Sequence, residues 1–369
     1  MGSISRPTIL HIGDPIKHNH ELYKQLSSEF DIIRPPLEEL HRERFTDALK
    51  QGKWGHFQAI MRPFWNTGGE MGQWDTELIS LLPSSVKVFA SAGAGYNWAD
   101  VDVLAEYGKL VECSTARVIR KSLISDTRPG ILYCNGAAAS SEAVADMAIY
   151  HIISVFRNMV WTQLAARSGD PEQFLDAHKY ATMTAHNPRG QKLGVIGLGN
   201  IGYAIAQKAV AAFRMGIHYH DLFRKSQEVE EAIGATFHES LDEMLGISDC
   251  VVLAAPFSGK TLIDSERLQK FKKGSRLVNI ARGGLVDEDA LVSALESGHI
   301  FAAGLDVHSN EPQVHPELVK NRQVNLTCHN AGGAIETNYG FERLAMENVQ
   351  AVLRGEGPLT PVNGHLIPK

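Results

Sequence analysis

Arg282, Glu311 and His329 each follow a short run of apolar residues in the second half of the chain. A guanidinium can bind a carboxylate and polarise a carbonyl, and an imidazole can exchange a proton with a hydroxyl near neutral pH. A neighbouring glutamate would favour the protonated imidazole and fix its orientation. The three residues therefore suit hydride transfer to and from a 2-keto acid. The alternative is that they are a surface charge, a loop residue and a strand end without catalytic roles.

A glycine-rich segment, Leu193–Gly202, reads as a strand, then Gly-x-Gly-x-x-Gly, then a helix. Gly197 would allow a tight turn, Gly199 a close approach of the backbone to a pyrophosphate, and Gly202 close packing of the helix on the strand. The phosphates would sit at the N-terminus of the helix, where free N–H groups favour negative charge. A loop that binds nothing is the alternative reading.

Asp221 ends the next apolar run, at the distance of about 20 residues from the glycines where a carboxylate binds the ribose hydroxyls and repels a 2′-phosphate. This position predicts NAD rather than NADP as the cofactor, although Arg224 and Lys225 nearby argue the other way. The cofactor-binding residues expected from this segment are Gly197, Gly199, Asn200, Ile201, Gly202 and Asp221.

Short β-branched runs alternate with amphipathic stretches around these residues, which predicts βαβ units and parallel sheets. The alternation is interrupted by one long helix expected over Ser141–Arg167, and a last helix is expected over Ile335–Leu353. We therefore predict an α/β fold with two Rossmann/flavodoxin-like doubly wound parallel-sheet domains and the active-site cleft between them. The predicted substrate-binding domain comprises residues 1–135 and 334–369, and the predicted NAD-binding domain comprises residues 136–333.

Residues 107–129 are predicted to be an insertion in the first domain. The segment joins a helix to a strand expected at Gly130–Asn135, a connection that usually takes only about 2–6 residues. It carries basic residues and no catalytic pattern, so we expect a poorly packed surface excursion. The alternative is that Lys109–Cys113 is the true strand.

The composition excludes several other classes of protein. The 369 residues are 44% hydrophobic and 21% charged with a net charge of −6, which argues against a disordered chain and against nucleic acid as a partner. No run reaches the ~18 apolar residues of a membrane span. The four cysteines form no Cys-x-x-Cys pair and the N-terminus lacks an apolar signal region, so we expect a cytoplasmic protein. His218 and His220 form a His-x-His pair without a third ligand at a telling spacing, and we predict no metal site.

Two segments resemble the signature of the D-isomer-specific 2-hydroxyacid dehydrogenase family. They are Asn279–Glu288 and Ala303–Val307, the latter followed by Glu311-Pro312. The resemblance extends from about Thr8 to the last helix. It implies an NAD-dependent enzyme, usually a homodimer, that interconverts a D-2-hydroxy acid and its 2-keto acid. His329 would then be the acid/base, Glu311 its partner and Arg282 the substrate clamp.

The resemblance also implies individual binding contacts. Asp306 would meet the nicotinamide carboxamide, and backbone N–H groups of Ala94 and Gly95 would bind the substrate carboxylate. Two departures from the family pattern are Cys328, where proline is usual, and the sequence Ala255–Ser258, where Pro-x-Thr is usual. The further cofactor contacts expected on these segments are Ala255, Pro256 and Ala281.

Within the family the chain most resembles the fungal D-mandelate dehydrogenases. Phe64 and Trp65 follow a strand predicted over Phe57–Met61 and could wall an apolar pocket for a phenyl ring. Ordinary packing of two aromatic residues is the alternative. A glyoxylate or hydroxypyruvate reductase, and an NADH-sensing binding protein like the co-repressors that share the fold, remain alternative functions.

Overall fold

The structure is a computed structural model that describes residues 6–64, 71–107 and 130–367. The chain divides into two compact units, of which the first comprises residues 1–140 and 334–369 and the second residues 141–333. Trp65 and almost all of the predicted insertion, including the alternative strand Lys109–Cys113, lie outside the described residues. Tyr107, the first residue of that predicted insertion, is buried in the core of the first unit.

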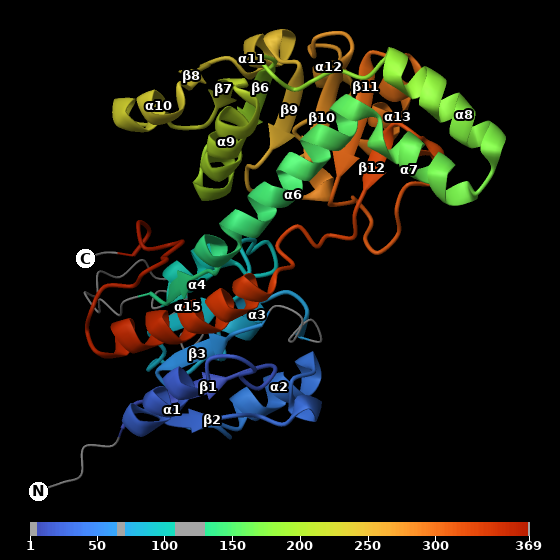
Figure 1. The fold of residues 1–369 in the computed structure, drawn as a ribbon. Coiled ribbons are helices and arrows are strands. Elements are labelled where there is room, and N and C mark those ends of the chain that lie inside the picture. Colours follow the sequence, from blue (N-terminus) through green and yellow to red (C-terminus); the bar gives the residue numbers. More distant parts are fainter. Residues whose placement is uncertain (1–5, 65–70, 108–129, 368–369) are drawn as a thin grey trace, which may run out of the picture. The chain divides into compact units, whose positions relative to one another are not determined.

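The first unit is built on a five-stranded parallel sheet with the strand order β2-β1-β3-β4-β5 (Figure 1). This is the flavodoxin-like doubly wound order. Its strands are β1 (Thr8–His11), β2 (Asp31–Ile33), β3 (Ala59–Arg62), β4 (Val88–Ser91) and β5 (Leu132–Cys134). The prediction that Gly130–Asn135 supplies a strand of the sheet is confirmed, because β5 pairs with β4.

Neighbouring residues of a strand point to opposite faces, and this sorts the helices of the first unit. Ile9 packs in the cluster that includes α1 and α15, whereas Leu10 packs in the cluster that includes α2, α3 and α4. The helical segments of the unit are α1 (His20–Glu29), η1 (Leu37–Glu39), α2 (Arg42–Lys50), α3 (Thr76–Ile79), α4 (Val101–Ala105) and α15 (Ile335–Leu353).

The second unit contains a seven-stranded parallel sheet with the order β12-β11-β10-β9-β6-β7-β8. The order reverses between β6 and β9, so the sheet has the Rossmann topology with its switch point beside β6. Its strands are β6 (Lys192–Ile196), β7 (Gly216–His220), β8 (Thr236–Phe237), β9 (Cys250–Leu253), β10 (Ser275–Asn279), β11 (Ile300–Leu305) and β12 (Val324–Leu326). The predicted fold class of two doubly wound parallel-sheet domains is thus confirmed.

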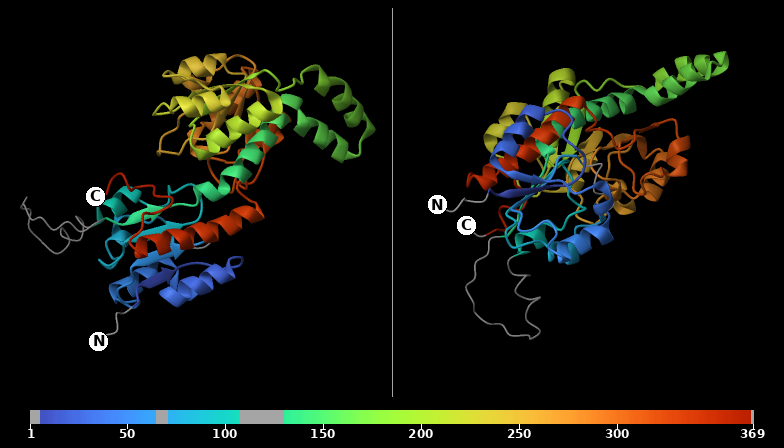
Figure 2. Two further views of the ribbon diagram at one scale, coloured as in Figure 1. Left: turned by 60° about the vertical axis from the view of Figure 1, so that its left-hand side comes forward. Right: turned by 90° about the horizontal axis from the view of Figure 1, so that it is seen from below.

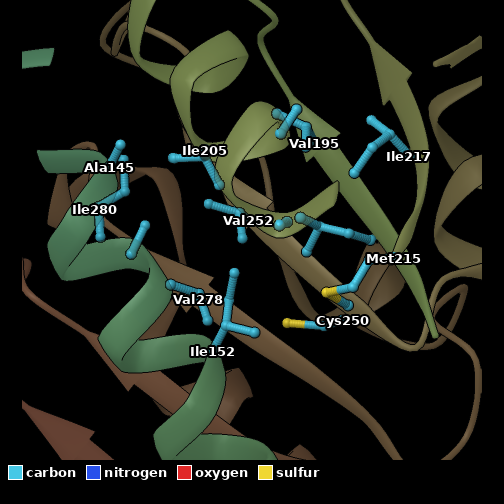
Figure 3. Packing of buried hydrophobic residues seen from close by; sticks show 14 of the residues in the cluster. Ala145, Ile152, Val195, Ile205, Met215, Ile217, Cys250, Val252, Val278 and Ile280 are labelled. Atoms are coloured by element: carbon cyan, nitrogen blue, oxygen red, sulfur yellow. The ribbon is translucent and has the colours of Figure 1, made fainter. Parts of the chain in front are cut away.

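Both faces of the second sheet are covered by helices. Val252 and Val278 face Ala145 and Ile152 of the long helix α6, with Ile205 of α9 in the same cluster (Figure 3). The adjacent strand residues point to the other face, where α11 and α13 pack. The helical segments of this unit are α6 (Ala137–Arg157, which begins in the first unit), α7 (Met159–Ser168), α8 (Pro171–Tyr180), η3 (Ala181–Met183), α9 (Asn200–Phe213), α10 (Gln227–Ile233), α11 (Leu241–Ile247), α12 (Ser265–Leu268), η4 (Gly283–Leu285), α13 (Glu288–Glu296) and α14 (Pro316–Lys320).

The single helix predicted over Ser141–Arg167 is wrong in two respects. The helix begins at Ala137, whose N–H donates to the Asn135 side chain at 3.3 Å. It is broken at Asn158, which has a left-handed φ of 53° and whose amide donates to the Ala181 carbonyl at 2.8 Å. These contacts override the continuous apolar pattern, and the chain after the break forms α7 and α8, which lie side by side (Figure 2).

Within the described residues, no helix has the length and apolar character to cross a bilayer.

Candidate active site

The glycine-rich segment forms the turn between β6 and α9, as its spacing predicts. Gly197 has a φ of 90° and its N–H donates to the His220 carbonyl. A Cβ on Gly202 would lie 2.0 Å from the Gly197 carbonyl oxygen, so only glycine lets the helix pack against this turn. A Cβ on Gly199 would meet nothing within 4 Å, which leaves open space on that side of the turn. The open space beside the N-terminus of α9 fits the pyrophosphate of a dinucleotide.

Asp221 stands directly after β7 and holds this turn. One carboxylate oxygen accepts the Leu198 N–H at 3.0 Å and the other accepts its neighbour Leu222 N–H at 2.8 Å. The Lys225 ammonium lies 3.0 Å from the first of these oxygens. The carboxylate is therefore fixed at the end of β7 beside the glycine turn, where a ribose hydroxyl of a bound dinucleotide could donate to it.

The turn after β9 approaches the glycine turn closely. A Cβ on Gly197 would lie 2.9 Å from the Cα of Ala255, so the absence of a side chain at Gly197 permits this contact. Pro256 follows and is exposed. Both residues thus border the switch point, the edge of the sheet where doubly wound folds bind their ligands.

Arg282 follows β10 in a loop whose shape depends on two neighbours. The Asn279 side chain accepts the Ala281 N–H and donates to the Arg282 carbonyl, which fixes the turn. A Cβ on Gly283 would lie 1.9 Å from the carbonyl carbon of His308, so glycine lets this loop lie against the loop after β11. Burial lowers the pKa of the Arg282 guanidinium, and the Glu311 carboxylate opposes that shift.

His329 and Glu311 meet in the second unit. His329 Nδ1 lies 2.7 Å from Glu311 Oε2, and the other oxygen of Glu311 accepts the His308 N–H at 2.9 Å. The glutamate thereby orients the imidazole, and Nε2 is the nitrogen on the opposite side of the ring. The structure thus places His329 in direct contact with Glu311, and the Glu311 carboxylate acts electrostatically on the Arg282 guanidinium.

The backbone of His329 has a left-handed φ of 51°, which a residue with a Cβ adopts only when its surroundings impose it. Asp306, after β11, supplies that constraint. Its carbonyl accepts the His329 N–H at 2.7 Å, and its carboxylate accepts the Asn330 N–H at 3.1 Å and the Ala331 N–H at 2.9 Å. Asp306 is 1% exposed, so these bonds are shielded from water.

A buried polar chain continues from Asp306 into the unit. The Thr327 hydroxyl donates to the Asp306 carboxylate at 2.6 Å, and His151 Nε2 lies 3.1 Å from the same hydroxyl. The Asn325 amide donates to His151 Nδ1 at 2.9 Å, so the Nε2 of a neutral His151 carries the proton and donates to Thr327. Burial lowers the pKa of His151 to about 4. Sequence reasoning missed Thr327 and His151, because neither has a telling spacing from His329.

Ala94 and Gly95, whose N–H groups are predicted to bind the substrate carboxylate, lie in the first unit in the loop after β4. The Asn135 amide donates to the Ala94 carbonyl at 2.9 Å, and the Gly136 N–H donates to the Gly93 carbonyl at 2.8 Å. Among the described residues, the N–H groups of Ala94 and Gly95 have no protein acceptor. Phe64 is 6% exposed, with the Lys17 ammonium 4.8 Å from its ring centre.

One further cation of the first unit was not anticipated. The Arg62 guanidinium is buried, donates to the Ser91 hydroxyl at 3.3 Å and lies 4.4 Å from the Trp98 ring centre. Ser91 ends β4 and is the first residue of the segment Ser91–Tyr96, which is predicted to be the substrate loop. In the described part of the chain, no group of three or more His, Cys, Asp or Glu side chains could hold a metal ion.

Comparison with known proteins agrees with this geometry. Residues 149–331 match the family described as D-isomer specific 2-hydroxyacid dehydrogenase, NAD binding domain. The chain is 33% identical over 350 residues to 4-methyl-2-oxopentanoate reductase A of Aspergillus oryzae, which covers 94% of this chain and 95% of that protein. The chain belongs to the D-isomer specific 2-hydroxyacid dehydrogenase family, as the two signature segments predict.

Two solved structures are similar to this chain over nearly its whole length. The holo form of Rhodotorula graminis D-mandelate dehydrogenase is 39% identical with a TM-score of 0.87, covering 99% of this chain and 100% of that one. A glyoxylate reductase from Paecilomyes thermophila is 35% identical with a TM-score of 0.82, covering 98% and 99%. The protein is therefore an NAD-dependent 2-hydroxyacid dehydrogenase, and the glycine turn described above fits that cofactor.

Proposed function

We propose that this enzyme interconverts D-mandelate and benzoylformate. The observation that carries the proposal is the likeness to D-mandelate dehydrogenase over 99% of the chain. The aromatic segment after β3, which carries Phe64 and continues to Trp65, is proposed to border the side chain of the substrate and to favour a phenyl group. Trp65 itself lies outside the described residues.

In the reduction of benzoylformate, a hydride adds to the carbonyl carbon and a proton adds to the carbonyl oxygen. NADH, when bound, supplies the hydride. We propose that His329 gives the proton from Nε2, while Glu311 holds Nδ1 and keeps the ring in place. The Arg282 guanidinium would polarise the carbonyl and hold the carboxylate. In the oxidation of mandelate the same imidazole takes the hydroxyl proton.

The remaining binding roles are part of the same proposal. The N–H groups of Ala94 and Gly95 would bind the substrate carboxylate, and Asp306 would face the nicotinamide carboxamide. The cofactor would be held by Gly197, Gly199, Asn200, Ile201, Gly202, Asp221, Ala255, Pro256 and Ala281.

The substrate assignment is tested by steady-state oxidation of NADH with four keto acids. These are benzoylformate, glyoxylate, hydroxypyruvate and 4-methyl-2-oxopentanoate. We expect the highest kcat/KM with benzoylformate. The second candidate is a glyoxylate or hydroxypyruvate reductase, favoured by the 35% identity to a glyoxylate reductase over nearly the full chain. A kcat/KM for glyoxylate at least equal to that for benzoylformate would select this second function.

We also propose that two copies associate through the α7–α8 pair. Leu164 on α7, Phe174 and Leu175 on α8, and Met183 on the following η3 are each more than half exposed, and exposed apolar side chains of this kind are typical of an interface. Sedimentation equilibrium should give a dimer, and replacing Leu175 with glutamate should shift it toward monomer. A monomeric wild type would refute this.

We further propose a cytoplasmic location, since Cys134, Cys250 and Cys328 are unpaired thiols. Fractionation of the native cell checks it: recovery in an oxidising compartment would refute it.

A further inference from the structure

The loop that follows Asp221 presents two cations close to the expected ribose site. Arg224 and Lys225 both lie within four residues of Asp221. Positively charged side chains at this place would attract the 2′-phosphate of NADP, because arginine accommodates that group in dinucleotide-binding folds. An enzyme of this family that prefers NAD therefore needs a feature that keeps these two cations from binding the 2′-phosphate of NADP.

Glu230 on α10 pairs with one of these cations, Arg224. Arg224 Nε donates to Glu230 Oε1 at 2.9 Å, and Arg224 Nη2 donates to Glu230 Oε2 at 2.8 Å. This bidentate pairing uses the same edge of the guanidinium that would grip a phosphate. Lys225 is paired separately, with its ammonium 3.0 Å from an Asp221 oxygen.

Glu230 is itself held rigidly. The Tyr219 hydroxyl donates to Glu230 Oε1 at 2.6 Å and in turn accepts the Lys225 N–H at 2.9 Å. The Glu230 side chain is 9% exposed, whereas that of Arg224 is 64% exposed. The Arg224 and Tyr219 hydrogen bonds lower the pKa of Glu230 to about 2, so it is ionised at neutral pH. The buried Glu230 carboxylate is thus a fixed counter-ion for the exposed Arg224 guanidinium.

We propose that Glu230 determines the preference for NAD over NADP by neutralising Arg224 and holding it away from a 2′-phosphate. Asp221 would repel the phosphate directly, while Glu230 removes the cation that could attract it. Glu230 is a positioning residue for cofactor specificity. The inference rests on the NAD chemistry of the family and is independent of which keto acid is reduced.

The test compares the binding of ADP-ribose and 2′-phospho-ADP-ribose by calorimetry, so it needs no turnover. Glu230→Gln keeps an acceptor for Tyr219 but removes the charge, and we expect it to tighten 2′-phospho-ADP-ribose about 5-fold or more. The size is moderate because an exposed ion pair is screened by water. Binding of ADP-ribose should stay within about 2-fold, and kcat/KM with NADPH should rise in parallel.

Glu231→Gln is the matched control. It removes one carboxylate from the adjacent position of the same helix, where Glu231 accepts a hydrogen bond from the Gln227 amide at 2.6 Å. We expect it to shift both affinities by less than about 2-fold. An equal gain in Glu230→Gln and Glu231→Gln would mean a general charge effect and would overturn the proposal.

Arg224→Ala completes the cycle. In the Glu230→Gln background it should abolish the gain in affinity for 2′-phospho-ADP-ribose. In the wild type it should leave the ratio of the affinities for ADP-ribose and 2′-phospho-ADP-ribose unchanged. A gain that persists without Arg224 would overturn the proposal. So would a loss of more than about 5-fold in 2′-phospho-ADP-ribose affinity from Arg224→Ala alone, because Arg224 would then already contact the phosphate. The measurement on Arg224→Ala alone keeps the proposal falsifiable even if Glu230→Gln fails to fold.

Discussion

Replacing Asp306 with asparagine should separate the positioning of His329 from the binding of the cofactor. The Asp306 carboxylate accepts three hydrogen bonds, from the Thr327 hydroxyl and from the N–H groups of Asn330 and Ala331. Asparagine offers one oxygen and one NH2 group, so at least one donor loses its acceptor and faces another donor. The change is nearly isosteric, and the fold around it need not move.

The cost follows from the number and type of bonds that change. A hydrogen bond to a charged group contributes about 1.5–3 kcal/mol, and a buried donor left unpaired costs about 1–3 kcal/mol. Since the two overlap, we expect the free energy of unfolding of the second unit to fall by about 2–5 kcal/mol. If about 1.5–3 kcal/mol of this reflects release of His329 from its left-handed backbone, kcat falls about 10- to 160-fold.

The assay is kcat with saturating NADH and keto acid, together with the Kd of NADH from fluorescence and a thermal melt. We expect kcat to fall by a larger factor than NADH affinity. A fall in NADH affinity as large as the fall in kcat would show that the nicotinamide contact proposed for Asp306, rather than the positioning of His329, accounts for the loss. A kcat within about 2-fold of wild type would refute the reasoning. Asp287→Asn is the control: Asp287 caps α13 through the Ala290 N–H, and asparagine caps nearly as well, so little should change.

Four other perturbations have expected outcomes. His329→Ala should lower kcat about 10²- to 10⁴-fold with NADH binding nearly intact, and retention of more than about a tenth of kcat would remove His329 from the acid role. Gly202→Ala should lower the melting temperature because its Cβ would meet the Gly197 carbonyl. Gly199→Ala should keep the melting temperature and weaken NADH binding, and an equal fall in the melting temperature of both variants would contradict this. Burial lowers the pKa values of His11 and His151 to about 4. As the pH drops from about 6.5 toward 4, these histidines become protonated in the unfolded state while they stay neutral in the folded state, so the melting temperature should fall. A melting temperature that does not change over this range would show that they do not stay neutral in the folded protein. Deleting residues 108–128 should leave a folded, active enzyme, since the Ile131 N–H donates to the Leu104 carbonyl and brings the two flanking segments together; an insoluble product would refute the predicted excursion.

Features governed by neighbouring residues in the chain could be predicted from the sequence. The turn between β6 and α9 is one, because its glycines act within a few residues of each other and the strand before it is unambiguous. The helix α15 matches its predicted bounds for the same reason: its apolar pattern runs without interruption. The break at Asn158 could not be predicted, since it depends on the Ala181 carbonyl more than twenty residues away.

In the candidate site, too, features set by neighbouring residues could be predicted from the sequence, whereas features set by contacts between distant segments could not. The sequence indicates that His329 stands near a strand end and that Glu311 is its candidate partner, but it cannot show why the imidazole is held in one orientation. That depends on contacts between loops that meet only because β10, β11 and β12 are adjacent in the sheet. Gly283 permits one such contact, and the Asp306 carboxylate makes the other. A substitution of Thr327 would therefore leave both signature segments intact and still displace the acid, because the geometry of the site depends on these hydrogen bonds between loops.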